Sequence, residues 1–326
     1  MKTVEQIGGE FALIERISKI LGKPKSKRVI RGIGDDCAVL KTGKEKLVWT
    51  IDCLVEGDHF NFDWFSPKEV GMKAIEINAS DIYSMNAKPA FALVSIIFPS
   101  GTEAKKIEEI YNGMKTAAKK HSLEIIGGNI THGAKLSIDV TMIGFVQGKP
   151  AYRNGAKPGD FLCVSGELGA SCAGLNLYLQ KKRGFEEVKK KHRQPKAQGK
   201  KALSLGKFVS AMKDVSDGLA SEARNICAES NCAAVIFNGK IPVSNEVRKA
   251  ASALKLNAEE FALFGGEDFE LAFTVSPKNL RKVKGFVVGE IIKGKGVFLK
   301  KNGKRKKLKR FGYDHFRNET KPKGLD

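Results

Sequence analysis

The sequence contains no long hydrophobic run. None of its 326 residues falls in a stretch that approaches the ~20 consecutive apolar residues needed by a membrane-spanning helix. The N-terminal segment also differs from a secretory signal peptide, because Glu10, Glu15 and Arg16 interrupt its apolar part. We therefore expect a cytoplasmic protein with no membrane partner.

No two of the six cysteines form a C-x-x-C pair. Their scattered spacing argues against a zinc site and against a disulfide framework. We expect reduced and mostly buried thiols at these positions, which are Cys37, Cys53, Cys163, Cys172, Cys227 and Cys232.

Acidic residues are scarce, since 36 Asp and Glu stand against 57 Lys and Arg, which gives a net charge of +21. Such a surface attracts either nucleic acid or small anions. The densest basic runs, 181–201 and 293–310, lack the interleaved aromatic residues of a single-strand-binding surface. No helix-turn-helix or zinc-finger spacing accompanies them. We expect small anionic substrates and no nucleic-acid partner, and we assign the 181–201 run no function.

The chain length favours two domains, each large enough to bury a core. A Gly- and Pro-rich stretch, GKPAYRNGAKPGD, lies near residue 150 and resembles a hinge. We therefore place an N-terminal domain at 1–150 and a C-terminal domain at 151–326. Helices and strands alternate in mixed order in both, so the predicted class is α/β of the α+β type.

Local signals predict the elements of each domain. Ser66 and Glu69 form a capping box around Pro67, which predicts an amphipathic helix over 66–87. A second helix is expected at 103–120, and strands at 46–55, 91–98 and 136–146. In the second domain we expect a helix over 217–230 capped by Asp217 or Ser216, and strands in DFLCV, AAVIFNG, ELAFTV and FVVGEII.

Several of the scarce carboxylates lie in glycine-flanked or apolar contexts. They are Asp35, Asp36, Asp52, Asp81, Asp214, Asp217, Glu267 and Asp268. Asp81 lies on the same predicted helical stripe as Ala74 and Ile77, where an unpaired charge is costly. Each motif alone can be explained as a turn or a helix cap. Together they favour a site for Mg²⁺, which takes carboxylate and phosphate oxygens as ligands.

The segment EIIGGNITHG, residues 124–133, reads as the end of a strand followed by a glycine turn. Glycine pairs at such places allow a sharp turn or the close approach of a ligand, and the backbone amides of glycine turns suit phosphates. The chain lacks both the G-x-x-x-x-G-K-[ST] motif and the protein-kinase motifs. These features indicate a Mg-nucleotide enzyme outside those two classes.

The motifs, in their order, closely resemble those of the thiamine-monophosphate kinase family, part of a superfamily that includes aminoimidazole-ribonucleotide synthetase. The resemblance runs nearly end to end, through GIGDDCAVL, TIDCLVEGDHF, NASDIYSMNAKP, IIGGNITHG, VSDGLA, GGEDFEL and the terminal FGYDHF. It implies an N-terminal mixed sheet with helices that pairs with its twin in a homodimer to close a β-barrel, and a C-terminal α/β domain that completes the substrate site. It also implies ATP-dependent phosphorylation of thiamine monophosphate to thiamine diphosphate.

The resemblance also implies the residues that bind each ligand. The expected Mg²⁺ ligands are Asp36, Asp52, Asp81, Asp214 and Asp217, with Thr50, Ile51 and Asn129 as further contributors. The expected ATP contacts are Tyr111, Gly128, Asn129, Arg153 and Ser216. The expected thiamine monophosphate contacts are His59, Glu267 and Tyr313, with Tyr313 stacking on the thiamine ring. The family normally has aspartate where Asn129 stands, so we expect weaker binding of one Mg²⁺.

The chemistry requires no catalytic side chain that forms a bond or removes a proton. The acceptor is a phosphate oxygen that is already ionised near neutral pH. Phosphoryl transfer then depends on positioning and on neutralising charge, so we expect direct in-line transfer and assign His121, His132 and His192 to surface or loop positions. Two alternatives remain, a catalytically weakened nucleotide-binding homologue and another superfamily member such as aminoimidazole-ribonucleotide synthetase.

Overall fold

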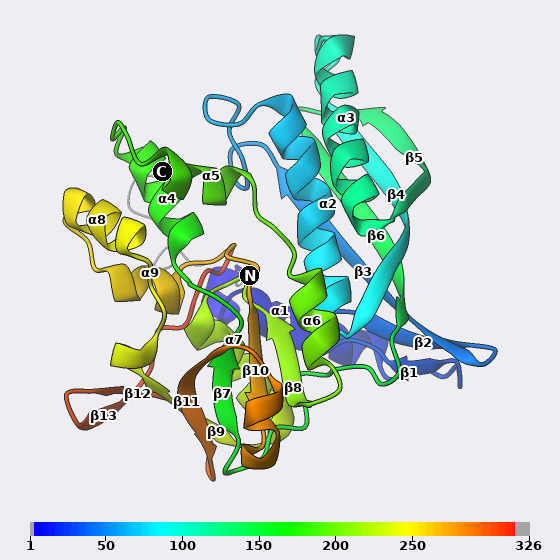
Figure 1. Cartoon of the computed structure of the whole chain (residues 1–326). Helices are drawn as coiled ribbons and strands as arrows, with labels where there is room; N and C mark the ends of the chain where they lie inside the picture. The colour runs from blue at the N-terminus through cyan, green and yellow to red at the C-terminus, as the bar shows by residue number, and fades with distance from the viewer. Residues whose placement is uncertain (1–2, 317–326) are drawn as a thin grey trace.

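Alternating buried and exposed residues build the first of two sheets. The computed structural model describes residues 3–316, and in their first half six strands form a mixed sheet in the order β1-β2-β3-β6-β4-β5 (Figure 1). All neighbouring pairs are antiparallel except β4 and β5, which are parallel. The strands are β1 (Val29–Arg31), β2 (Ala38–Thr42), β3 (Glu45–Val55), β4 (Ala87–Phe98), β5 (Glu124–His132) and β6 (Ser137–Val146). This confirms the strands predicted within β3, β4 and β6, and leaves the sheet open in the described protomer.

Two long helices, α2 (Pro67–Ser84) and α3 (Ala104–His121), cover one face of this sheet (Figure 1). The predicted capping box is confirmed, because Ser66 and Glu69 exchange backbone-to-side-chain hydrogen bonds. The prediction that α2 is amphipathic is wrong, since most of its residues are buried between the sheet, α3 and the second domain. Gly71 permits this packing, because a Cβ atom there would lie 1.8 Å from the carbonyl oxygen of Ile110.

The predicted glycine turn in EIIGGNITHG is wrong. Strand β5 continues through both glycines and pairs with β4 as far as His132 opposite Phe98. Glycine is needed here for a close approach between strands, since a Cβ atom on Gly128 would lie 1.9 Å from the carbonyl oxygen of Val94. β5 is the edge strand of the sheet, and nearly all of it is exposed.

The second domain is built on a seven-stranded sheet in the order β13-β12-β9-β11-β7-β10-β8. Only β9 and β12 pair in parallel. The strands are β7 (Phe161–Val164), β8 (Val209–Asp214), β9 (Ala233–Phe237), β10 (Leu271–Val275), β11 (Phe286–Ile292), β12 (Gly296–Lys301) and β13 (Lys304–Lys307). The four strands predicted in this half are therefore confirmed as β7, β9, β10 and β11, within a mixed α/β architecture.

The remaining helices lie outside the two sheets (Figure 1). They are η1 (Glu5–Ile7), α1 (Glu10–Leu21), α4 (Ala170–Leu179), α5 (Glu186–Arg193), α6 (Gly199–Leu205), α7 (Leu219–Ser230), η2 (Asn238–Lys240), α8 (Asn245–Leu254), α9 (Ala258–Phe264) and η3 (Pro277–Lys282). The predicted cap of α7 is wrong, because its N-cap is Gly218 and no side chain caps it. Within residues 3–316, no helix has the length and apolar character required to cross a bilayer.

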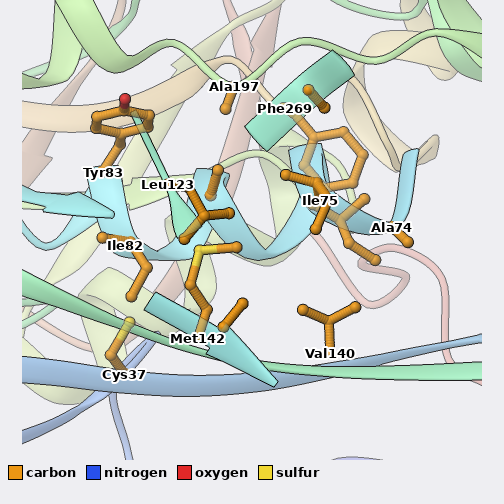
Figure 2. Close-up of a cluster of buried hydrophobic side chains, with 14 of the residues drawn as sticks. Cys37, Ala74, Ile75, Ile82, Tyr83, Leu123, Val140, Met142, Ala197 and Phe269 are labelled. Atoms are coloured by element: carbon orange, nitrogen blue, oxygen red, sulfur yellow. The ribbon is translucent and has the colours of Figure 1, made fainter. Parts of the chain in front are cut away.

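The main hydrophobic core joins the two domains. Figure 2 shows α2 residues such as Ile75 and Ile82 and the β6 residues Val140 and Met142, together with Phe269 from the second domain. The same cluster includes Phe273 of β10. Because one apolar core crosses the boundary, the two domains hold a fixed relation and the cleft between them has defined walls.

Candidate active site

A cleft of about 1300 Å³ lies between the two domains. Its walls come from β3, the end of α2, the loop after β8 and the segment that follows β13. It is lined by most of the residues predicted as ligands, namely Asp36, Thr50, Ile51, Asp52, His59, Asp81, Arg153, Asp214, Ser216, Asp217, Glu267 and Tyr313. Predicted ligands from both halves of the chain therefore line one cavity.

Three carboxylates form the centre of this cleft. Asp36, Asp81 and Asp214 each place an oxygen within 4.8 Å of the others. The Asp36 carboxylate accepts a hydrogen bond of 2.8 Å from the Ser84 hydroxyl. Asp81 accepts one of 2.7 Å from Thr50, and Asp214 one of 2.7 Å from Ser80. Hydroxyl groups on β3 and α2 thus fix the orientation of all three acids.

The carboxylates repel one another. Burial, reinforced by the charge of Asp214, raises the pKa of Asp52 to about 7. Burial likewise raises the pKa values of Asp214 and Asp217 to about 6, and burial together with Asp52 holds the pKa of Asp81 well above its usual range. A cluster of hard oxygen donors that resists ionisation suits a divalent cation, which would relieve this repulsion.

Two basic side chains reach into the same cluster. The Arg153 guanidinium donates to Asp36, with its Nε atom 3.1 Å from Oδ1. The Lys213 ammonium lies 2.9 Å from a Glu222 carboxylate oxygen. Burial opposes the charge of Asp36, but Arg153 and Lys213 outweigh it and hold the Asp36 pKa below its ordinary value. Asp36 is therefore the one carboxylate of the central three whose ionised form the protein itself favours.

The other end of the cleft is organised around Glu267. Lys73 of α2 is fully buried and lies 2.6 Å from Glu267 Oε1, while its Nζ also donates to the His59 carbonyl oxygen at 2.8 Å. His192 Nδ1 lies 3.4 Å from Glu267 Oε2. Glu267 has a φ of +63°, a left-handed conformation that a non-glycine residue adopts only when its surroundings enforce it. Contacts from both domains therefore fix this carboxylate.

The segment after β13 closes over the same end. The Tyr313 hydroxyl donates to Asp58 at 3.1 Å, and His315 Nδ1 lies 3.2 Å from the other Asp58 oxygen. The His59 and His315 rings are 5.0 Å apart. The hydrogen bond with His315, above all, lowers the pKa of Asp58 to about 2, and the same bond raises the pKa of His315. The contacts of Tyr313 and His315 with Asp58 thus hold the segment after β13 against the wall of the cleft.

Three predicted ATP contacts do not line the cleft of this protomer. Tyr111 lies on α3, and Gly128 and Asn129 lie on the edge strand β5. Asn129 pairs with Ser95 and is exposed. Directly paired residues point to the same face of a sheet, so Asn129 shares the open face with Leu93, opposite to α2 and α3.

Sequence reasoning missed Lys73, Lys213 and Glu222. Lys213 and Glu222 flank the recognised VSDGLA motif on either side, which was the available signal. The prediction of surface positions for His121 and His192 is wrong, because both are buried. His121 lies 3.2 Å from Glu76, and burial lowers the pKa of His192 to about 3, so it is neutral near pH 7.

Comparison with known proteins agrees with this geometry. The family described as AIR synthase related protein, N-terminal domain, matches residues 34–146, and its C-terminal domain counterpart matches residues 157–302. The thiamine-monophosphate kinase of Aquifex aeolicus (strain VF5) is 35% identical over 313 residues, which cover 94% of this chain and 98% of the relative. That of Bacillus subtilis (strain 168) is 36% identical over 337 residues, with 94% and 99% covered.

A solved structure gives the same result. AaThiL complexed with AMPPCP and TMP matches this chain with a TM-score of 0.88 at 35% identity, covering 97% of this chain and 99% of that one. The two domain families, the full-length relatives and this structure agree with the resemblance inferred from the motifs. The chain belongs to the thiamine-monophosphate kinase family, within the AIR synthase related proteins.

Proposed function

We propose that this protein transfers the γ-phosphoryl group of ATP directly to thiamine monophosphate, forming thiamine diphosphate for thiamine biosynthesis. The observation that carries the proposal is that one cleft contains both the carboxylate cluster and Glu267, whose position is fixed by contacts from both domains. Its relative AaThiL binds an ATP analogue and TMP together. The cytoplasmic location expected from the sequence is part of the same proposal.

The carboxylate cluster is the proposed Mg²⁺ site. Asp36, Asp52, Asp81, Asp214 and Asp217 supply its oxygen ligands, with Thr50 orienting Asp81. Burial and, after it, mutual repulsion raise several of these pKa values, and a divalent cation would relieve both costs. Bound Mg²⁺ would neutralise charge on the phosphates of ATP and of the acceptor. Ile51 stays a predicted contributor: it lines the cleft, but its apolar side chain offers no ligand atom.

The chain's own residues position the two reactants. Arg153 and Ser216 line the cluster end and are proposed to contact ATP phosphates. His59, Glu267 and Tyr313 line the other end and are proposed to hold thiamine monophosphate. Because the acceptor oxygen is already ionised, no residue needs to remove a proton. A phosphorylated protein trapped during turnover would overturn direct transfer.

A homodimer is the proposed setting for the remaining ATP contacts. The face of the first sheet opposite α2 and α3 carries exposed apolar side chains, including Trp49, Ile51, Phe91 and Leu93. A second copy packing face to face would bury them and close a β-barrel from two open sheets. Asn129, which lies on this face, would then serve the site of the partner subunit rather than its own, while Gly128 and Tyr111 stay predicted ATP contacts.

Release of ADP from Mg-ATP, with thiamine monophosphate as the only acceptor, tests the proposed activity. The proposal predicts turnover that requires both the acceptor and the divalent cation. The second candidate is a weakened nucleotide-binding homologue, which the neutral Asn129 favours because the family normally has an acid there. Nucleotide binding without turnover above background would support that alternative instead.

A further inference from the structure

Lys213 is a buried cation at the centre of the carboxylate cluster, and no ligand prediction included it. It is the penultimate residue of β8, and only 4% of its surface is exposed. Lysine is almost never fully buried unless its charge is paired. The groups that surround its ammonium therefore indicate the role of the charge.

The ammonium contacts five oxygens, one of which is the Asp214 backbone carbonyl oxygen at 3.5 Å. Its Nζ lies 2.9 Å from Glu222 Oε2 and 3.2 Å from Ser216 Oγ. It lies 3.4 Å from Asp214 Oδ1 and 3.5 Å from Asp36 Oδ1. This shell of carboxylate and hydroxyl oxygens is the kind that a metal cation would otherwise attract.

The hydrogen bonds divide the aspartates into two groups. Asp36 and Asp214 each have one oxygen bonded to a serine and the other facing Lys213. By contrast, among residues 3–316 the carboxylates of Asp52 and Asp217 accept no described hydrogen bond, and Asp81 is bonded through one oxygen to Thr50. One oxygen of each carboxylate in the first group thus faces a cation of the chain, whereas within residues 3–316 no carboxylate of the second group forms an ion pair.

We propose that Lys213 is a resident cation of the metal centre. It occupies the position between Asp36 Oδ1 and Asp214 Oδ1, so these two residues ligate Mg²⁺ only through their other oxygens, and the cluster binds one divalent cation fewer than its carboxylates alone would hold. This inference rests on the proposed function. Asp36 belongs to the first domain and Asp214 to the second, so the ammonium also holds the two halves of the centre together before any ligand binds. Lys213 is thus a positioning residue, and Glu222 balances its charge.

Manganese binding tests the inference independently of turnover. Mn²⁺ is titrated into the full chain with AMPPCP and thiamine monophosphate present, and free Mn²⁺ is measured by electron paramagnetic resonance. Lys213→Met keeps the length and apolar stem but removes the charge. We expect one additional Mn²⁺ per protomer, or Mn²⁺ affinity about tenfold or more higher, because one unit charge near a partly buried cation has a large effect. Lys213→Arg should retain wild-type binding.

Lys207→Met is the matched control, since Lys207 is exposed and removing it changes the net charge by the same amount. Equal stoichiometry and affinity in wild type, Lys213→Met and Lys207→Met would overturn the inference while leaving the proposed function intact. No Mn²⁺ binding in any of the proteins would contradict the proposed metal centre and this inference with it.

A crystal of the wild-type protein soaked in Mn²⁺ gives a second test that does not depend on the folding of a variant. Anomalous scattering is expected beside Asp52, Asp81 or Asp217, with the ammonium still between Asp36 and Asp214. A Mn²⁺ peak bridging Asp36 and Asp214 with Lys213 displaced would refute the proposal.

Discussion

Asp81 shows at the scale of a single residue how a site can be built at a cost to stability. Its carboxylate lies among Asp36, Asp52 and Asp214, and burial together with Asp52 holds its pKa well above the usual range. Thr50 supplies only one hydrogen bond in compensation. The residue is therefore unfavourable for folding by itself, and the proposed cation would offset that cost.

Replacing Asp81 with asparagine should reverse this balance. We expect Asp81→Asn to stabilise the metal-free protein by roughly 1–3 kcal/mol, the usual cost of a poorly satisfied buried polar group. Because the variant lacks the ligand, added Mg²⁺ should raise its melting temperature less than that of the wild type. Thermal unfolding with and without Mg²⁺ measures both effects, and an equal Mg²⁺ increment in the two proteins would contradict the assignment.

His315 should make the closure over the cleft depend on pH. Its pKa is raised by Asp58, so its contribution to stability is present below the unfolded value of about 6.5 and is lost as pH rises through the higher folded value. We expect wild type to be more stable than His315→Gln at about pH 6 and the difference to vanish by about pH 9. Denaturant unfolding at both pH values measures it. If the stability difference between wild type and His315→Gln grew with pH, it would contradict the proposed interaction of protonated His315 with Asp58.

The carboxylates of the site could be located from the sequence, whereas its lysines could not. Asp52 and Asp81 stand out because an acid in an apolar segment conflicts with its surroundings. Lys73 and Lys213 attract no notice in a chain with 57 basic residues. Only the packing of α2 and β8 against the cleft shows that these two lysines face carboxylates rather than solvent.

At the scale of elements, α2 carries the connection between the two ends of the cleft. Asp81 of this helix, which accepts a hydrogen bond from Thr50, lies in the carboxylate cluster. Lys73, two turns earlier on the same helix, contacts Glu267. The segment that contains α5, within the basic run 181–201, packs against the same helix through Arg193, which lies 3.2 Å from Glu69. The basic run is therefore partly structural, and its His192 also contacts Glu267.

Lys73→Met should weaken binding of the acceptor more than binding of ATP. Removing the ammonium leaves Glu267 without its main partner, at a typical cost of about 3–5 kcal/mol for breaking a buried pair. We expect KM for thiamine monophosphate to rise about tenfold or more, with a smaller change in KM for ATP. Steady-state kinetics with each substrate varied measures the two values. Lys68→Met, at an exposed site on the same helix, is the control, and equal increases in both KM values would contradict the role.

Helices and strands were predicted correctly where the signal lies in adjacent residues, and incorrectly where the structure depends on packing against another element. The capping box of α2 needs only Ser66 and Glu69, so the sequence contains it completely. The two glycines of β5 are compatible with a turn or with a strand, and the choice depends on β4, whose Val94 carbonyl needs the space beside Gly128. Similarly, α2 could not be recognised as buried on most sides without the second domain.

At the scale of the whole molecule, the open face of the first sheet is the largest feature that one protomer leaves unexplained. Leu93 on β4 and Trp49 on β3 are 44% and 49% exposed, and Asn129 lies on the same face as Leu93. Burial of such side chains stabilises association by about 25 cal/mol per Å² of apolar area. The proposed homodimer through this face would account both for the apolar surface and for the position of Asn129 outside the cleft of its own protomer.

Leu93→Glu tests this arrangement. A charge on the proposed interface should shift the protein from dimer to monomer and reduce kcat/KM by about tenfold or more, since each site would lose its partner's residues. Phe286→Glu places the same charge at an exposed apolar site on the second sheet and should change neither. Sedimentation equilibrium and kinetics give the two readouts. A fully active Leu93→Glu monomer would refute the shared site.

The fate of the γ-phosphate of ATP distinguishes direct transfer to thiamine monophosphate from transfer through the protein. ATP labelled at the γ position is mixed with Mg²⁺, thiamine monophosphate and the protein, and the products are separated after a rapid quench. Direct transfer predicts that the label appears in the terminal phosphate of thiamine diphosphate, in an amount equal to the ADP formed, and that none is bound to the protein. ATP that remains intact, or label retained on the protein before product appears, would contradict it.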